Sequence, residues 1–183
     1  MTVIAAIHDP KARRTWIGCD SWISVTRDFG APWAFKKWHV EGPWAIGVSG
    51  PTLLQNVVEA DSGEVFYSGR VPREKPLEVS FALRDCVHAH GWRSKDDGAP
   101  AYDFNAILAS RDGCWMVGAD FSVDAIPPDE FFAYGAGMDS ALGAAHLAKS
   151  TGLDHEATLK AALEAACAVH RACSAPIWTR CLT

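Results

Sequence analysis

The chain has no run of eighteen apolar residues, about the length that a membrane-spanning helix needs. Its first residues also lack the basic-then-apolar order of a secretory signal peptide. The formal net charge of −5 differs from the excess of positive charge that is typical of nucleic-acid-binding proteins. These absences lead us to expect a cytoplasmic protein with no membrane association and no nucleic-acid partner.

Motifs for metal and nucleotide binding are lacking as well. The six cysteines form no Cys-x-x-Cys pair and no zinc-ligand spacing, so we expect reduced and mostly buried thiols. Cys86 and His90 would share one helical face, but no third ligand follows at a useful spacing. No glycine-rich phosphate loop is present. We therefore expect neither a metal nor any other cofactor.

What is present is an ordinary globular composition. Of the 183 residues, 49% are apolar and 21% are charged, which is typical of a folded soluble protein and not of a disordered one. The length suits one domain over residues 1–183, with enough chain to bury a sizeable core.

Short apolar, β-branched runs between turn residues predict strands, and apolar positions three and four apart predict helices. In the first half, the predicted strands are residues 2–8, 14–20, 35–40 and 44–50. Predicted helices cover 51–60 and 77–90, with loops at 30–32 and 68–76.

In the second half, Asp112-Gly113 between two apolar runs is a strong hairpin signal. The predicted strands are 104–110, 114–119, 131–135 and 177–182, and the predicted helices begin near Asp139 or Ser140 and cover 155–172, with Asp154 as an N-cap. This order predicts an α+β fold. Two antiparallel sheets would stack face to face with helices outside, as a four-layer αββα sandwich.

The second residue, Thr2, could act as a nucleophile. Removal of Met1 would give Thr2 a free α-amine beside its own hydroxyl. An N-terminal amine has a reference pKa of about 7.7–8.0, so near neutral pH it can accept the hydroxyl proton. Thr2 would then carry both a nucleophile and a base, whereas a retained Met1 would leave an amide in the place of the base.

The opening stretch, Thr2-Val3-Ile4 followed by a hairpin to Gly18-Cys19-Asp20, resembles proteasome β subunits and the proteolytic subunit of the bacterial two-component ATP-dependent peptidase (the HslV type). Those proteins open with Thr-Thr-Ile and continue to Gly-Ala-Asp or Gly-Gly-Asp. Lys37-Trp38 and Gly47-Val48-Ser49-Gly50 resemble their lysine step and glycine turn. The resemblance implies a proteasome-like N-terminal nucleophile hydrolase, with Thr2, Asp20 and Lys37 as catalytic residues.

Each residue has an implied role. Thr2 would attack a peptide carbonyl, Lys37 would stabilise charge, and Asp20 would hold Lys37 in place. The backbone N–H groups of Ser49 and Gly50 would form an oxyanion hole. Without the family comparison, Lys36 is an equal candidate for the lysine, and either lysine could be a solvated side chain at a strand edge.

Two motifs depart from the family pattern. The supporting serine of a Gly-Ser-Gly motif is replaced in Gly135-Ala136-Gly137. The family's Arg-Asp-Ala-x-Ser-Gly-Gly motif becomes the sequence of residues 171–176, in which Ser174 is the candidate for the supporting serine. Loss of supporting groups predicts impaired or altered chemistry.

Two functional hypotheses follow. The first is an N-terminal threonine peptidase or amidase, self-associated into a ring and served by an ATPase or unfoldase, a partner implied by the resemblance alone. The second is a catalytically inactive subunit with this fold, serving in the structure or assembly of a larger particle such as one encoded by a phage. Most of the eight tryptophans would be core residues, although some could line subunit contacts.

Overall fold

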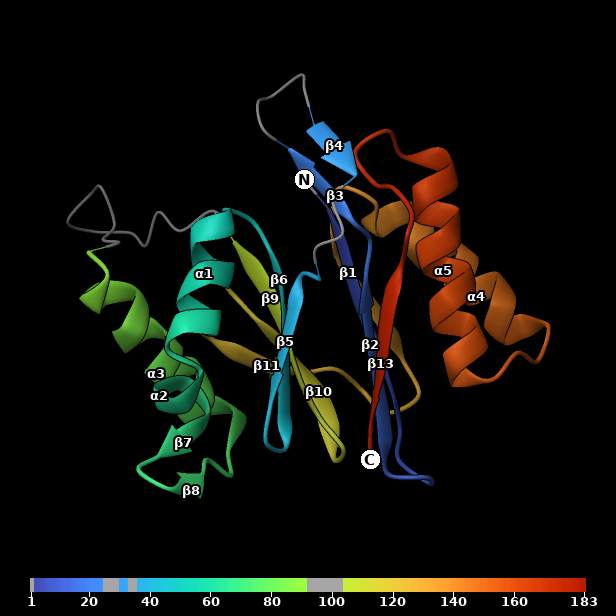
Figure 1. Ribbon diagram of the computed structural model, residues 1–183. Coiled ribbons are helices and arrows are strands. Elements are labelled where there is room, and N and C mark those ends of the chain that lie inside the picture. Colours follow the sequence, from blue (N-terminus) through green and yellow to red (C-terminus); the bar gives the residue numbers. More distant parts are fainter. Residues whose placement is uncertain (1, 25–29, 33–35, 92–103) are drawn as a thin grey trace.

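The computed structural model describes residues 2–24, 30–32, 36–91 and 104–183. Two antiparallel sheets stack face to face, and helices cover the outer face of each sheet (Figure 1). The chain termini lie at opposite ends of this sandwich. The predicted α+β, four-layer αββα architecture is confirmed.

The first sheet has the strand order β12-β1-β2-β13, and the second has the order β11-β10-β9-β6-β5. The strands of the first sheet are β1 (Val3–Asp9), β2 (Arg14–Cys19), β12 (Phe131–Gly135) and β13 (Trp178–Leu182). Those of the second are β5 (Trp38–Glu41), β6 (Trp44–Ser49), β9 (Asn105–Ser110), β10 (Gly113–Val117) and β11 (Val123–Ala125). Two small ribbons pair β3 (Trp22–Ser24) with β4 (Gly30–Pro32), and β7 (Tyr67–Ser68) with β8 (Val71–Pro72).

The helices form the two outer layers (Figure 1). The layer over the second sheet consists of α1 (Thr52–Ala60), α2 (Ser62–Phe66) and α3 (Pro76–Ala89). The layer over the first sheet consists of α4 (Met138–Ser150) and α5 (His155–Val169), with the side chain of Asp154 capping α5 as predicted. Among the helices of the described residues, none is long and apolar enough to cross a membrane.

Strand β1 is apolar from Val3 to Ile7 because both of its faces are covered there. Val3, Ala5 and Ile7 pack with α4 and α5. Ile4 and Ala6 point the other way, into the core between the two sheets. Successive side chains of a strand alternate between faces, so a strand between two apolar layers reads as a continuous apolar run. This is how the sequence buries Thr2 at the start of a central strand.

Several local predictions were wrong. Residues 30–32 form β4 and pair with β3, although Gly30-Ala31-Pro32 reads as a loop; an edge strand tolerates this proline. Part of the predicted loop at 68–76 forms the β7–β8 ribbon. The sequence also gave no expectation of α2 or β11, which are too short to show a periodicity. Helix α5 ends at Val169 instead of 172, and residues 33–35, including predicted strand residue Phe35, lie outside the described residues.

Candidate active site

Three segments bring Thr2, Asp20 and Lys37 together at one end of the sandwich. The β1–β2 pairing aligns Ile4 with Cys19, and the Asp20 backbone N–H then donates to the Val3 carbonyl at 3.2 Å. Lys37 comes immediately before β5, and its carbonyl accepts from the N–H of Val48 in β6 at 2.9 Å. Neighbouring strands of both sheets therefore fix the three backbones.

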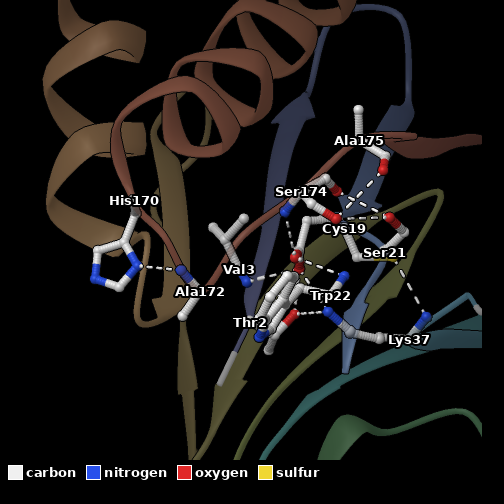
Figure 2. A network of polar contacts seen from close by, with 11 residues as sticks. Thr2, Val3, Cys19, Ser21, Trp22, Lys37, His170, Ala172, Ser174 and Ala175 are labelled. Atoms are coloured by element: carbon white, nitrogen blue, oxygen red, sulfur yellow. Dashed lines mark hydrogen bonds and ion pairs between the residues drawn. The ribbon is translucent and has the colours of Figure 1, made fainter. Parts of the chain in front are cut away.

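The Thr2 hydroxyl lies between a carboxylate and an ammonium (Figure 2). It donates a hydrogen bond to Asp20 Oδ1 and accepts one from Lys37 Nζ. Lys37 Nζ also lies 2.6 Å from Asp20 Oδ1. Thr2, Asp20 and Lys37 are 4%, 0% and 7% exposed, so this network is almost entirely shielded from water.

The Asp20 carboxylate accepts further hydrogen bonds from three backbone N–H groups. Val3 donates to Oδ1 at 2.9 Å. Trp22 and Ser174 donate to Oδ2, at 2.9 and 3.2 Å. A buried ion pair is stable only when its remaining polar atoms are satisfied, and here both carboxylate oxygens are. The orientation of Asp20 is therefore fixed, and through it the position of the Lys37 ammonium.

The Ser174 segment closes the site from the side of the chain's last strand. The Ser174 carbonyl accepts from both the N–H and the hydroxyl of Ser21, at 3.0 and 2.9 Å. The Ser174 hydroxyl lies 3.3 Å from the Ser21 hydroxyl, and it also donates to the Ala175 carbonyl (Figure 2). Ser174 thus contacts Asp20 through its backbone, while its side chain contacts Ser21 and Ala175.

Several solved structures align with this chain over nearly its whole length. The structure of BPH from Thiobacillus denitrificans aligns with a TM-score of 0.78 and 23% identity, over 100% of this chain and 97% of that one. The eukaryotic HslV from Trypanosoma brucei aligns with a TM-score of 0.71 and 19% identity, over 99% of both chains. The Gly-1 mutant of Anbu from Hyphomicrobium sp. strain MC1 aligns with a TM-score of 0.71 and 12% identity, over 98% of this chain and 80% of that one.

The chain has the proteasome β-subunit-like, N-terminal nucleophile hydrolase fold. The expected resemblance is confirmed at the level of the fold. No protein-family profile matches the sequence, and no curated protein is similar to it in sequence. The likeness is therefore carried by the arrangement of the strands and helices.

In this proteasome-like fold, the structure distinguishes the two lysines between which the sequence left a choice. Lys37 contacts Thr2 and Asp20 directly. Lys36 is exposed, and its ammonium lies 5.3 Å from the ring centroids of both Trp38 and Trp178. A lysine at that distance from two indole faces makes cation–π contacts. Lys37 is thus the lysine of the site, and Lys36 joins the edges of the two sheets.

The predicted oxyanion residues lie at the end of β6. Gly50 has a φ of +151°, a backbone conformation that favours glycine. Along an extended strand, successive N–H groups point to opposite neighbours. Because the Val48 N–H donates toward β5, the Ser49 N–H faces β9, and its residue pairs there with Asn105. This alternation favours the Gly50 N–H over that of Ser49 as an oxyanion donor.

Two cysteines lie next to the site, although the sequence did not indicate that position for either of them. The Sγ atom of Cys19 accepts a hydrogen bond from the Lys37 N–H at 3.3 Å. Cys173 follows α5 and packs close to Gly137. Burial raises the pKa of both thiols to about 12, so neither is a thiolate near neutral pH. The hydroxyl of Thr2 therefore has no competing thiolate from these two neighbours.

Other contacts of the site also depend on the fold. The backbone N–H groups of Val3 and Trp22 and the side chain of Ser21 all join the network (Figure 2). Backbone donors carry no signature in a sequence, so only the adjacency of Ser21 to Asp20 could have suggested a part of it.

Proposed function

We propose that this protein is an N-terminal threonine peptidase that hydrolyses peptide bonds through an acyl-enzyme on Thr2. The observation that carries the proposal is the buried Thr2 hydroxyl in contact with both Asp20 and Lys37. The proteasome-like fold supports the same reaction class. Of the aligned structures, one is BPH in complex with epoxomicin, with a TM-score of 0.78, 22% identity and coverage of 100% and 98%.

The proposed reaction begins after Met1 has been removed. The α-amine of Thr2 takes the proton from the Thr2 hydroxyl, and Oγ1 attacks the carbonyl carbon of the scissile peptide bond. The Gly50 N–H stabilises the negative oxygen of the tetrahedral intermediate. The protonated amine then gives its proton to the leaving nitrogen, which departs and leaves an ester on Thr2. A water molecule, deprotonated by the same amine, hydrolyses that ester and regenerates the enzyme.

Lys37 and Asp20 have electrostatic and positioning roles in this scheme. The ammonium of Lys37 stabilises the negative charge that develops on Oγ1 as its proton leaves. Asp20 keeps the ammonium at the hydroxyl, since Lys37 Nζ lies 2.6 Å from Asp20 Oδ1. Groups that are already oriented before the reaction lower the barrier because they need no reorganisation during it.

The mass of the intact protein is the first test, because the scheme requires loss of the initiator methionine. Turnover of fluorogenic peptides by the wild type, Thr2→Ala and Thr2→Ser is the second. We expect Thr2→Ala to lose turnover by roughly a thousandfold or more, as for removal of other catalytic nucleophiles, and Thr2→Ser to retain it. Epoxomicin should add its mass to the wild type and not to Thr2→Ala. Turnover in Thr2→Ala equal to the wild type would remove Thr2 from the mechanism.

A second candidate function has support from Ala136, which replaces the supporting serine that the resemblance implies. Under this alternative, the chain is a catalytically inactive structural or assembly subunit. It predicts no epoxomicin adduct on any variant, including a wild type that has lost Met1. The two candidates therefore differ in a measurement that needs no knowledge of the natural substrate.

The proposal also includes self-association of the chain. Exposed apolar side chains on both helical layers support it. Leu147 on α4 and Val169 on α5 are 64% and 75% exposed. Leu53 on α1 and both Leu77 and Phe81 on α3 are also exposed. Apolar surface of this kind is typical of subunit contacts. Light scattering coupled to size-exclusion chromatography should give a mass several times 19.8 kDa, whereas a monomer at micromolar concentration would contradict it. An ATP-dependent unfoldase partner follows from the resemblance alone.

A further inference from the structure

The side chain of Ser49 faces the space between the two sheets, beside the start of β1. In β6, Trp44, Ile46 and Val48 pack under the helices of the second sheet. The alternate residues face the other way: Ala45 lies in the core between the sheets, and a Cβ on Gly47 would contact Ile17 and Ile4. Ser49 is the next residue after Gly47 on this face of β6. Because Gly47 lies beside Ile4, Ser49 lies further along β1, toward Thr2.

The surroundings of Gly135 place the Ser49 hydroxyl next to the backbone of Thr2. A Cβ built on Gly135 would lie 2.1 Å from the Thr2 carbonyl oxygen and 2.8 Å from Ser49 Oγ. Because both oxygens lie so close to one point, they are near neighbours. The hydroxyl therefore sits at the main chain of Thr2, on the side of β12.

The direction of the Thr2 nitrogen can be inferred from that of the Thr2 carbonyl. In an extended strand, the nitrogen and the carbonyl oxygen of one residue point toward the same neighbouring strand. Val3 illustrates this, since both its N–H and its carbonyl pair with Asp20, beyond the end of β2. The Thr2 carbonyl accepts from the Gly137 N–H, which follows β12. If Thr2 continues the extended course of β1, its nitrogen faces β12 and the Ser49 hydroxyl as well.

The Ser49 hydroxyl is available for such a contact. The residue is only 8% exposed, and none of the described residues forms a hydrogen bond with its Oγ atom. A hydroxyl oxygen has two lone pairs and can accept a hydrogen bond from an ammonium or amine. A free α-amine on Thr2 would be such a donor.

We propose that Ser49 is a positioning residue, whose hydroxyl accepts a hydrogen bond from the α-amine of Thr2 and holds that amine against the Thr2 hydroxyl. This inference rests on the proposed peptidase function, because only that function needs a free amine. The nitrogen lone pair must point at Oγ1 to take its proton, and a hydrogen bond from one of the amine N–H groups to Ser49 fixes the rotation that achieves this.

The test compares Ser49→Ala, Ser49→Thr and Ser110→Ala as full-length proteins with Met1 removed. Ser110 is the matched control, because it is also buried and pairs with Trp44 at the opposite end of β6. We expect Ser49→Ala to lower kcat about tenfold, an ordinary effect for a group that orients a catalytic base. KM should change by less than about twofold, since Ser49 is not proposed to bind substrate. Ser49→Thr keeps the hydroxyl on a β-branched residue that suits a strand, and should restore most of kcat.

Four outcomes decide the proposal. An unchanged kcat in Ser49→Ala, with Thr2→Ala inactive, would overturn the role of Ser49 and leave the proposed function standing. A raised KM with normal kcat would show a substrate contact instead of a positioning role, and would also overturn it. An equal loss of kcat in Ser110→Ala, or a melting temperature that falls in step with kcat, would assign the effect to stability. A loss of kcat confined to Ser49→Ala and rescued by Ser49→Thr would support the proposal.

Discussion

The ammonium of Lys37 lies 2.6 Å from Asp20 Oδ1, and the two side chains are 9% and 0% exposed. This is an ion pair removed from water, and it includes the Thr2 hydroxyl as its third member. Burying two charges costs free energy that only good geometry and further hydrogen bonds can offset. The backbone N–H groups of Val3, Trp22 and Ser174 provide those hydrogen bonds to the Asp20 carboxylate. Such a costly arrangement at the edge of a sandwich is typical of a site that performs chemistry.

Replacing Lys37 by Met should both destabilise the protein and abolish the proposed turnover. The variant would leave the Asp20 carboxylate buried without a countercharge, which costs about 3–5 kcal/mol in comparable buried pairs. The free energy of unfolding from urea titrations checks the first effect, and peptide turnover the second. A stability equal to the wild type would mean that the pair contributes no net interaction.

The exposed pair of Arg13 with Asp112 is the natural control for Lys37→Met. Arg13 Nε donates to Asp112 Oδ1 at 2.9 Å, but the two side chains are 61% and 53% exposed. Pairs in water contribute about 0–1 kcal/mol. We therefore expect Asp112→Asn to change the free energy of unfolding by less than about 1 kcal/mol and to leave turnover unchanged. A loss as large as that of Lys37→Met would contradict the importance of burial.

Replacing Gly135 by Ala should disturb Thr2 directly. Gly135 has a φ of +100°, and an added Cβ would lie 2.1 Å from the Thr2 carbonyl oxygen. That atom belongs to the backbone, so it cannot move aside without moving Thr2. Backbone strain of this kind costs about 1–3 kcal/mol, and we expect turnover to fall much further than stability, because Thr2 would no longer be aligned with Lys37.

Gly143→Ala is the matched control for Gly135→Ala. Gly143 lies inside α4, and an added Cβ would meet nothing within 4 Å. Alanine in a helix interior is more stable than glycine by about 0.5–1 kcal/mol. The variant should therefore melt slightly above the wild type with unchanged turnover. If both glycine variants lost turnover equally, the close approach of Gly135 to Thr2 would not be the cause.

The limits of the sequence prediction follow from how far apart in the chain each contact lies. Thr2 and Asp20 are joined by one hairpin, whose apolar strands and charged turn predict their proximity locally. Lys37 reaches them only through the packing of one sheet on the other, which no local periodicity reveals. For that reason the residues alone did not separate Lys37 from Lys36, and the family resemblance favoured Lys37.

The same reasoning explains what the sequence could not predict. The Ser49 hydroxyl lies near the Thr2 backbone because β6 and β1 belong to different sheets that stack at this point. Ser174 reaches Asp20 across more than 150 residues of chain, through a backbone N–H that has no signature in the sequence. The sequence presents Gly135 and Gly137 as a motif, but the close approach of Thr2 that requires a glycine at 135 is visible only in three dimensions.

The buried thiols should react slowly in the native protein. Burial raises the pKa of Cys19 and Cys114 to about 12. Since the thiolate is the nucleophile, iodoacetamide at pH 8 should leave both residues unmodified in the native state and label them rapidly in urea. Peptide mapping by mass spectrometry measures this. Rapid native labelling of Cys19 would mean that the site is open to solvent.

The raised pKa of Cys19 also predicts how stability depends on pH. In the unfolded chain the thiol loses its proton near its ordinary pKa of 9.0, whereas in the folded protein it keeps the proton until about 12. Between these values the folded state binds more protons, so the free energy of unfolding must fall as the pH rises from 9 toward 12, and the contribution is fully present below 9. Because tyrosines and lysines also titrate in this range, the comparison must be made against Cys19→Ala. Urea titrations at pH 8, 9.5 and 10.5 should show a smaller decline in Cys19→Ala than in the wild type. Equal declines in the two proteins would mean that the Cys19 thiol, next to Lys37 and Asp20, titrates in the fold as it does in water.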